Sequence, residues 1–165
     1  MARKIPRSFR VGKLTFKDGT AVTPVSLEIT ACNGDFSFKP GQAEVKEVKR
    51  RGVLSEVYKG DEAFGEISFS CDWIELKKET GDPAEAIWDF IVNQAGTLVS
   101  TRGGNVFCFD IAFELSNPDS PGQKETLAFD DCFLKGGAPQ LAEGDPNKIS
   151  FTLGTFSKQP TVTRT

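Results

Sequence analysis

The chain has 165 residues, a hydrophobic content of 38% and a formal net charge of −3 at neutral pH, which suits one globular domain with a core of its own. No apolar run of about 18 residues occurs, so we expect no membrane-spanning helix. The charged start Met1–Arg7 has no apolar stretch after it, so we expect no secretory signal and a protein made in a cytoplasm.

The first 40 residues contain short strands with two different faces. Phe9–Phe16 is interrupted only by Gly12, and Val25–Thr30 alternates strictly between apolar and polar residues. Asn33-Gly34 separates the second strand from a short one at Phe36–Phe38, and this pair of residues is typical of tight hairpin turns. The sequence therefore predicts a β-hairpin between these last two strands.

Residues 41–61 differ from their surroundings. Charged residues alternate loosely here with few large apolar ones, and Gly52 interrupts the pattern. A stretch this long with so little core-forming potential is uncommon inside a compact domain. We predict a protruding loop or hairpin, with Lys49-Arg50-Arg51 solvated rather than bound to nucleic acid.

Phe64–Leu76 is predicted to be a long strand with an apolar face and a polar face. A single helix follows, because Asp82-Pro83 and Glu85 provide a capping acid, a proline at the first helical position and a glutamate three residues after the cap. Its apolar stripe should cover the sheet through Ile87, Trp88 and Ile91, together with Ala84 and Ala95.

The remaining elements are again strands. They are predicted at Thr97–Thr101, Val106–Leu115, Glu125–Leu134 and Ile149–Leu153, and residues 157–165 read as a polar tail. The fold class is therefore mainly β, a β-sandwich or barrel-like domain over residues 1–165 with one flanking helix and a long protruding loop at 41–61.

Chemistry is sparse in this sequence. There is no histidine, so the commonest general base and the usual triads are missing. The cysteines are far apart and form no metal-binding pair, so we expect isolated reduced thiols. Asp130 and Asp131 are adjacent in a strand and should point to opposite faces. We expect no catalytic residue, no metal, no cofactor and no enzymatic activity.

The surplus of apolar strand surface favours self-association. The 14 Phe residues against one Tyr offer apolar area without a polar group, and an open sheet leaves edges that must be paired or covered. Six basic residues and no acids lie between Met1 and Lys17, whereas eight acids and two lysines lie between Asp110 and Asp145. Unlike faces of identical subunits could therefore meet in a ring. The alternative is that a closed sandwich or barrel hides these faces in a monomer.

The order of elements resembles the major tail tube proteins of long-tailed, siphovirus-like bacteriophages, from about Phe9 to Phe156. The resemblance depends on succession and spacing: the early hairpin, the charged loop, the long strand and the lone helix. The segments that carry it are Arg51-Gly52-Val53, the strand from Phe64, the helix Pro83–Ala95, Phe107–Ile111, Leu127–Asp131 and Glu143-Gly144-Asp145.

The resemblance implies a structural virion protein whose subunits form hexameric rings, with the inner strands joined into a continuous β-barrel. The rings would stack into the tail tube that conducts DNA during genome ejection. Residues 41–61 would then reach the neighbouring ring. The candidate inter-ring contacts are Glu44, Lys46, Glu47, Lys49, Arg50, Arg51, Glu56 and Tyr58.

The resemblance also implies an acidic lumen that does not bind DNA tightly, since bound phosphates would resist sliding. The candidate lumen residues are Glu66, Asp72, Asp110 and Glu114. The implied partners are other copies of the chain, the tape-measure protein, transiting DNA, and the tail terminator and tail-tip proteins. The implied location is the virion tail, assembled in the host cytoplasm.

Other interpretations remain open at this point. The chain could be another ring-forming tail component, such as a tail terminator or distal tail protein, or a subunit like that of the type VI secretion tube. From a different class, it could be a monomeric β-sandwich that binds a ligand. Such a module would favour exposed Trp and Tyr in loops, whereas both Trp residues here fall in predicted regular elements.

Overall fold

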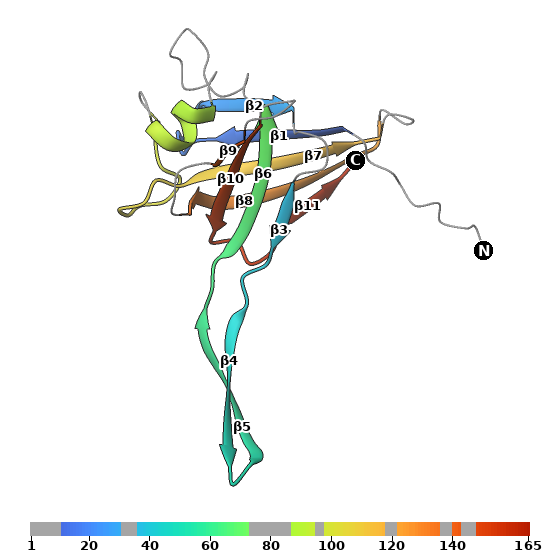
Figure 1. The fold of residues 1–165 in the computed structure, drawn as a ribbon. Coiled ribbons are helices and arrows are strands. Elements are labelled where there is room, and N and C mark those ends of the chain that lie inside the picture. The colour runs from blue at the N-terminus through green and yellow to red at the C-terminus, as the bar shows by residue number, and fades with distance from the viewer. Residues whose placement is uncertain are drawn as a thin grey trace, which may run out of the picture.

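Two antiparallel sheets and one short helical segment are present in the computed structural model, which describes residues 11–30, 36–72, 87–94, 98–117, 122–135, 140–142 and 148–165 (Figure 1). The larger sheet contains β1 (Val11–Lys17), β2 (Ser26–Thr30), β3 (Ser37–Lys39), β6 (Gly65–Asp72), β7 (Phe109–Ser116), β8 (Lys124–Leu134), β9 (Gln140–Ala142), β10 (Lys148–Thr155) and β11 (Thr161–Arg164). The smaller sheet contains β4 (Ala43–Arg50) and β5 (Val53–Glu62), and the helical segment is η3 (Asp89–Asn93). The predicted mainly β fold is confirmed, and the larger sheet is not closed into a barrel.

The larger sheet bends at β8. Its strand order is β2-β1-β7-β8-β10-β6-β3, with β11 paired to β8 and β9 paired to β10. A register shift opposite Phe109 and a positive φ of 52° at Asp131 mark a β-bulge in the middle of β8. The first part of β8 pairs with β11, and the last part pairs with β10. This bend turns the two halves of the sheet toward each other, as in a β-sandwich.

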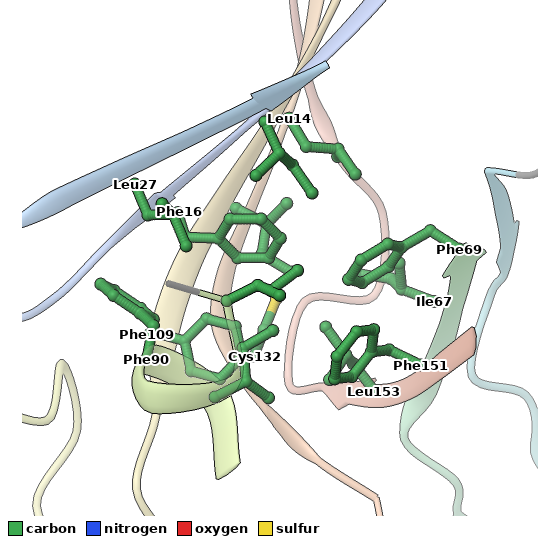
Figure 2. Close-up of a cluster of buried hydrophobic side chains, with 14 of the residues drawn as sticks. Leu14, Phe16, Leu27, Ile67, Phe69, Phe90, Phe109, Cys132, Phe151 and Leu153 are labelled. Carbon is green, nitrogen blue, oxygen red and sulfur yellow. The ribbon is translucent and has the colours of Figure 1, made fainter. Parts of the chain in front are cut away.

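The core lies between these two halves (Figure 2). Phe16 on β1 and Phe69 on β6 have ring centroids 5.7 Å apart, although three strands separate β1 from β6 in the sheet order. The buried positions of β1, β6, β7 and β10 follow the predicted period of two, whereas the bulge in β8 puts its buried residues, Phe129 and Cys132, three positions apart. The fully buried strand residues with the largest side chains are Phe16, Phe109, Phe129, Phe151, Leu14, Ile67, Ile111, Ile149 and Leu153.

The helical segment closes one side of the core. Ile87 and Ile91 are fully buried, and Trp88 is half-buried against the same cluster. Phe90, which the predicted stripe omitted, is also fully buried and contacts Phe16 and Phe109 at centroid distances of 6.2 and 5.9 Å. Ile87, Phe90 and Ile91 stand at positions i, i+3 and i+4, which share one face of a helical turn, so all three can face inward. The remainder of the predicted helix lies outside the described residues.

Three of the four cysteines lie among the described residues. Cys108 and Cys132 are free and buried, and Cys71 is buried as well. Burial raises the pKa of the Cys132 thiol to about 12, so this group stays protonated at physiological pH. Cys32 lies outside the described residues.

Three local predictions need correction or extension. The prediction of a hairpin between Val25–Thr30 and Phe36–Phe38 is wrong, because β2 pairs with β1, and β3 pairs with β6 in the other half of the sandwich. The turn signal is local, whereas β2 is placed by packing its apolar face beside that of β1. Residues 98–101 form no strand, and the polar tail contains β11, which is paired to β8.

Candidate assembly surface

The hairpin formed by β4 and β5 projects away from the body of the molecule (Figure 1). Its strands pair with each other and form a separate two-stranded sheet. A two-stranded hairpin is marginally stable in water unless something else packs on it. A projection of this length is therefore suited to contact with another molecule.

One face of the hairpin carries exposed aliphatic side chains. The register places Val45 opposite Lys59 and Glu47 opposite Val57, and Leu54 lies opposite Lys49 near the turn. Val45, Leu54 and Val57 are 63%, 52% and 57% exposed, and we call them the apolar face. The prediction from sequence emphasised charged residues and did not select these three as contacts.

The predicted inter-ring residues all lie on this hairpin and are exposed. They are Glu44, Lys46, Glu47, Lys49 and Arg50 on β4, Arg51 in the turn, and Glu56 and Tyr58 on β5. Their ion pairs are local: Lys46–Glu44 at 3.7 Å and Lys49–Glu47 at 3.8 Å. The Tyr58 hydroxyl donates to Glu56, which raises the pKa of the tyrosine. Lys49, Arg50 and Arg51 make up the basic tip.

The base of the hairpin is closed by a tight backbone approach, and one surface ion pair joins it to the body. A Cβ on Gly41 would lie 2.1 Å from the Ala63 carbonyl oxygen, so only glycine lets the two strands approach this closely. Lys158 Nζ lies 3.1 Å from Glu62 Oε1, and hydrogen bonds from Lys59 and Lys158 lower the pKa of Glu62. These contacts define the direction in which the hairpin leaves the body.

Three phenylalanine rings lie together at the surface beside this base, and we call them the phenylalanine patch. Phe64 follows β5 directly, and its ring centroid is 5.3 Å from Phe133 and 4.8 Å from Phe156. Phe64 is 52% exposed and Phe156 is 37% exposed. A Cβ on Gly154 would lie 2.4 Å from the Phe133 ring, so this glycine makes room for the patch.

Asp110, Asp130 and Asp131 lie next to the phenylalanine patch, and we call them the acidic cluster. The Arg102 guanidinium lies 4.2 Å from the Phe156 ring centroid and also pairs with Asp131 at 3.4 Å. The Asp131 backbone N–H donates to Asp110. Burial raises the pKa of Asp110, and the carboxylates of Asp130 and Asp131 add to this shift. Asp130 and Asp131 were predicted to point to opposite faces because adjacent residues in a regular strand do so. The β-bulge in β8 lies at these two residues, so the regular alternation does not hold there.

The predicted lumen residues are not brought together. Glu66 lies on β6, whereas Asp110 and Glu114 lie on β7, and β8 and β10 separate these strands in the sheet. Glu66 pairs with Lys135 at 2.6 Å, and Glu114 pairs with Lys124 at 3.0 Å. Asp72 ends β6, and its side chain lies outside the described part.

The sheet has edges that no other described strand covers. Among the described strands, β2 and β11 end one half of the sandwich, and β3 ends the other. All four residues of β11 are exposed. Such edges can pair with a strand from another chain.

The described residues show neither a metal site nor a membrane span. No group of three or more His, Cys, Asp or Glu side chains among them could hold a metal ion. No helix in the described part is long and apolar enough to cross a membrane.

Comparison with known proteins identifies the fold. No protein-family model matches the sequence, and no curated protein matches it either. A chain in the cryo-EM structure of an extracellular contractile injection system, the PVC sheath/tube terminator in the extended state, is 16% identical, with a TM-score of 0.52 over 99% of this chain and 98% of that one. A chain in the cryo-EM structure of the anti-feeding prophage (AFP) baseplate is 11% identical, with a TM-score of 0.47 over 99% and 97% of the two chains. The likeness to the first of these two chains shows a shared fold.

Proposed function

We propose that the protein is a non-enzymatic, ring-forming component of a phage-tail-like particle and that it forms the ring at the end of a tube, as a terminator. The observation that carries this proposal is the fold shared, over 99% of the chain, with a chain in the PVC sheath/tube terminator structure. The sequence resemblance to tail tube proteins points to the same class of particle. The proposed location is accordingly the tail of a virion or of a related particle.

The surfaces of the chain support a ring. The open edges β2 and β11 belong to the same half of the sandwich but lie at its two opposite sides. Two unlike edges on one subunit permit head-to-tail contacts, which form a closed ring when the rotation between subunits closes. The projecting hairpin then provides a second kind of contact besides the sheet edges.

A second candidate is the tail tube subunit itself. It is favoured by the length of the hairpin, whose predicted contact residues would join ring to ring. In that role Glu66, Asp110 and Glu114 would face the lumen from different strands, with the tape-measure protein and DNA as partners. The terminator is preferred because of the structural likeness.

Negative-stain electron microscopy of the purified protein over a range of concentrations distinguishes these roles. A terminator should give discrete closed rings that do not elongate as the concentration rises. Tubes of stacked rings would instead support the tail tube subunit. A protein that stays monomeric throughout would overturn both and favour the ligand-binding β-sandwich.

A further inference from the structure

The phenylalanine patch is an apolar surface that the described chain leaves uncovered. Three mutually contacting rings have no polar atoms to offer water, and two of them keep 52% and 37% of their surface exposed. Exposed apolar clusters with a polar rim mark sites of protein contact. Arg102 and the acidic cluster form that rim on one side.

The β4–β5 hairpin carries an apolar surface next to a basic one, just as the body carries an apolar patch next to an acidic cluster. Its apolar face ends at Leu54, three residues from Arg51 in the basic tip. On the body, Arg102 touches both Phe156 and Asp131, so the patch and the acidic cluster are also adjacent. An apolar face beside a basic tip would therefore meet an apolar patch beside an acidic cluster.

Within one copy these two surfaces do not meet. The hairpin strands pair with each other, and the hairpin extends away from its base (Figure 1). The patch lies beside that base, because Phe64 is two residues beyond the end of β5. The hairpin of one copy cannot reach the phenylalanine patch of the same copy, but the hairpin of a second copy can.

Building on the proposed self-assembly, we propose that the phenylalanine patch of one copy binds the β4–β5 hairpin of a second copy. The apolar face packs on the three rings, and the basic tip lies beside the acidic cluster. The contact is heterologous, since it joins unlike surfaces, so every copy can both give and receive a hairpin.

A disulfide trap tests this contact in the full-length protein. One preparation carries Val57→Cys and another carries Phe156→Cys, both with Cys32→Ser, and the two are mixed and oxidised. A disulfide between these two chains can form only between copies. The expected result is a disulfide-linked dimer on a non-reducing gel, at a yield several-fold above that of either preparation oxidised alone and above a matched control with Val22→Cys in place of Phe156→Cys. Val22 is 93% exposed, lies in the loop between β1 and β2, and belongs to neither the hairpin nor the phenylalanine patch.

Charge reversal tests the orientation of the hairpin. Arg50→Glu in the hairpin chain should lower the yield of heterodimer, and Asp130→Lys in the patch chain should lower it as well. Combining the two variants should restore the yield. Arg50 is preferred to Arg51 because Arg51 has a φ of 52°. Single reversals without effect would overturn the placement of the tip beside the acidic cluster.

Failure of this contact is distinguishable from failure of the proposed function. Closed rings by electron microscopy without a trapped heterodimer above control would overturn the contact alone. A trapped heterodimer without rings would support the contact and overturn the ring-forming role. A protein that gives neither overturns both.

Discussion

Asp18 lies in the loop that joins β1 to β2, and only 3% of its surface is exposed. Its carboxylate accepts hydrogen bonds from the Thr20 hydroxyl at 2.6 Å, the Val25 N–H at 2.7 Å and the Val99 N–H at 3.1 Å. One side chain thus shapes its own loop and attaches it to residues 98–101. Burial by itself would raise the pKa of Asp18, but these hydrogen bonds outweigh it and lower the pKa.

We predict that Asp18→Ala lowers the free energy of unfolding by about 1.5–3 kcal/mol at pH 7, because buried N–H groups lose a charged acceptor. Because the folded-state pKa is lowered, the wild-type advantage is present above the ordinary value of 3.8 and is lost as the pH falls through the folded-state value. Urea unfolding at pH 7 and at acidic pH measures both effects. A gap between the two proteins that persists unchanged in acid would contradict this role.

Asp110 gives the opposite prediction. Burial and the carboxylates of Asp130 and Asp131 raise its pKa, so the folded state favours its protonated form. The ionised carboxylate therefore costs stability above the folded-state pKa, and this cost disappears below the unfolded-state pKa. Asp110→Asn keeps an oxygen that can accept from the Asp131 N–H. We expect it to stabilise the protein slightly at pH 7, by no more than about 1 kcal/mol.

Thermal unfolding of the Asp110→Asn variant at pH 7 and in acid measures this effect. The gain at pH 7 should shrink as the pH falls. Glu114→Gln, on the same strand, is a suitable control, because Glu114 is already paired with Lys124. If Asp110→Asn destabilises the protein at pH 7, the hydrogen bond from Asp131 must depend on the charge.

Among the elements, strands with a clear period of two were the most predictable from sequence. Within the predicted ranges Val106–Leu115 and Phe64–Leu76, the buried faces of β7 and β6 were predicted correctly, since alternation follows directly from strand geometry. Residues 106–108 are not part of the strand, and Cys108 is buried although it was placed on the polar face. Pairing was harder to predict, because which strands meet depends on the bend at Asp131, and a positive φ there leaves no clear local signal. The partner of β2 was missed for another reason: the Asn33-Gly34 turn signal is local, whereas β2 packs its apolar face beside that of β1.

In the candidate assembly surface, too, local features were predictable from sequence and contacts between distant segments were not. The projecting hairpin was predictable, because residues 43–62 lack core-forming potential. The phenylalanine patch was not, since Phe64, Phe133 and Phe156 come from three separate places in the chain. Gly154, which makes room for Phe133, belongs to a strand whose pattern gives no hint of that contact.

Replacing residues 44–61 with a short Gly/Ser linker should leave a folded body. The hairpin packs on no other described element, so we expect the free energy of unfolding to change by less than about 1 kcal/mol. The linker begins after Ala43 and ends before Glu62, which keeps the closure at Gly41 and the ion pair to Lys158. Far-UV circular dichroism and urea unfolding measure the outcome, and loss of cooperative unfolding would show that the hairpin is part of the folding unit.

At the scale of the whole molecule, the chain combines a core buried within one copy with apolar surfaces and sheet edges that the described residues leave exposed. The facing halves of the sandwich bury their apolar strand residues within one copy, so the monomer has a core of its own. The apolar face, the phenylalanine patch and the open edges remain available outside that core. Folding and assembly therefore draw on different residues, and substitutions can separate them.

This separation predicts that thermal stability depends on protein concentration. Assembly binds only folded chains, so each tenfold rise in concentration can add up to about 1.4 kcal/mol once subunits associate. For a chain of this size that corresponds to an increase in Tm of about 3–5 °C per tenfold. Differential scanning calorimetry over two decades of concentration measures the slope of Tm against the logarithm of protein concentration.

The Phe156→Ser variant should flatten this slope while leaving the Tm of the dilute protein within a few degrees of wild type, because Phe156 is 37% exposed and lies outside the core. Val22→Ser, a matched loss of an exposed apolar side chain away from the patch, should keep the wild-type slope. A wild-type Tm that does not change with concentration would mean that these surfaces do not associate with each other.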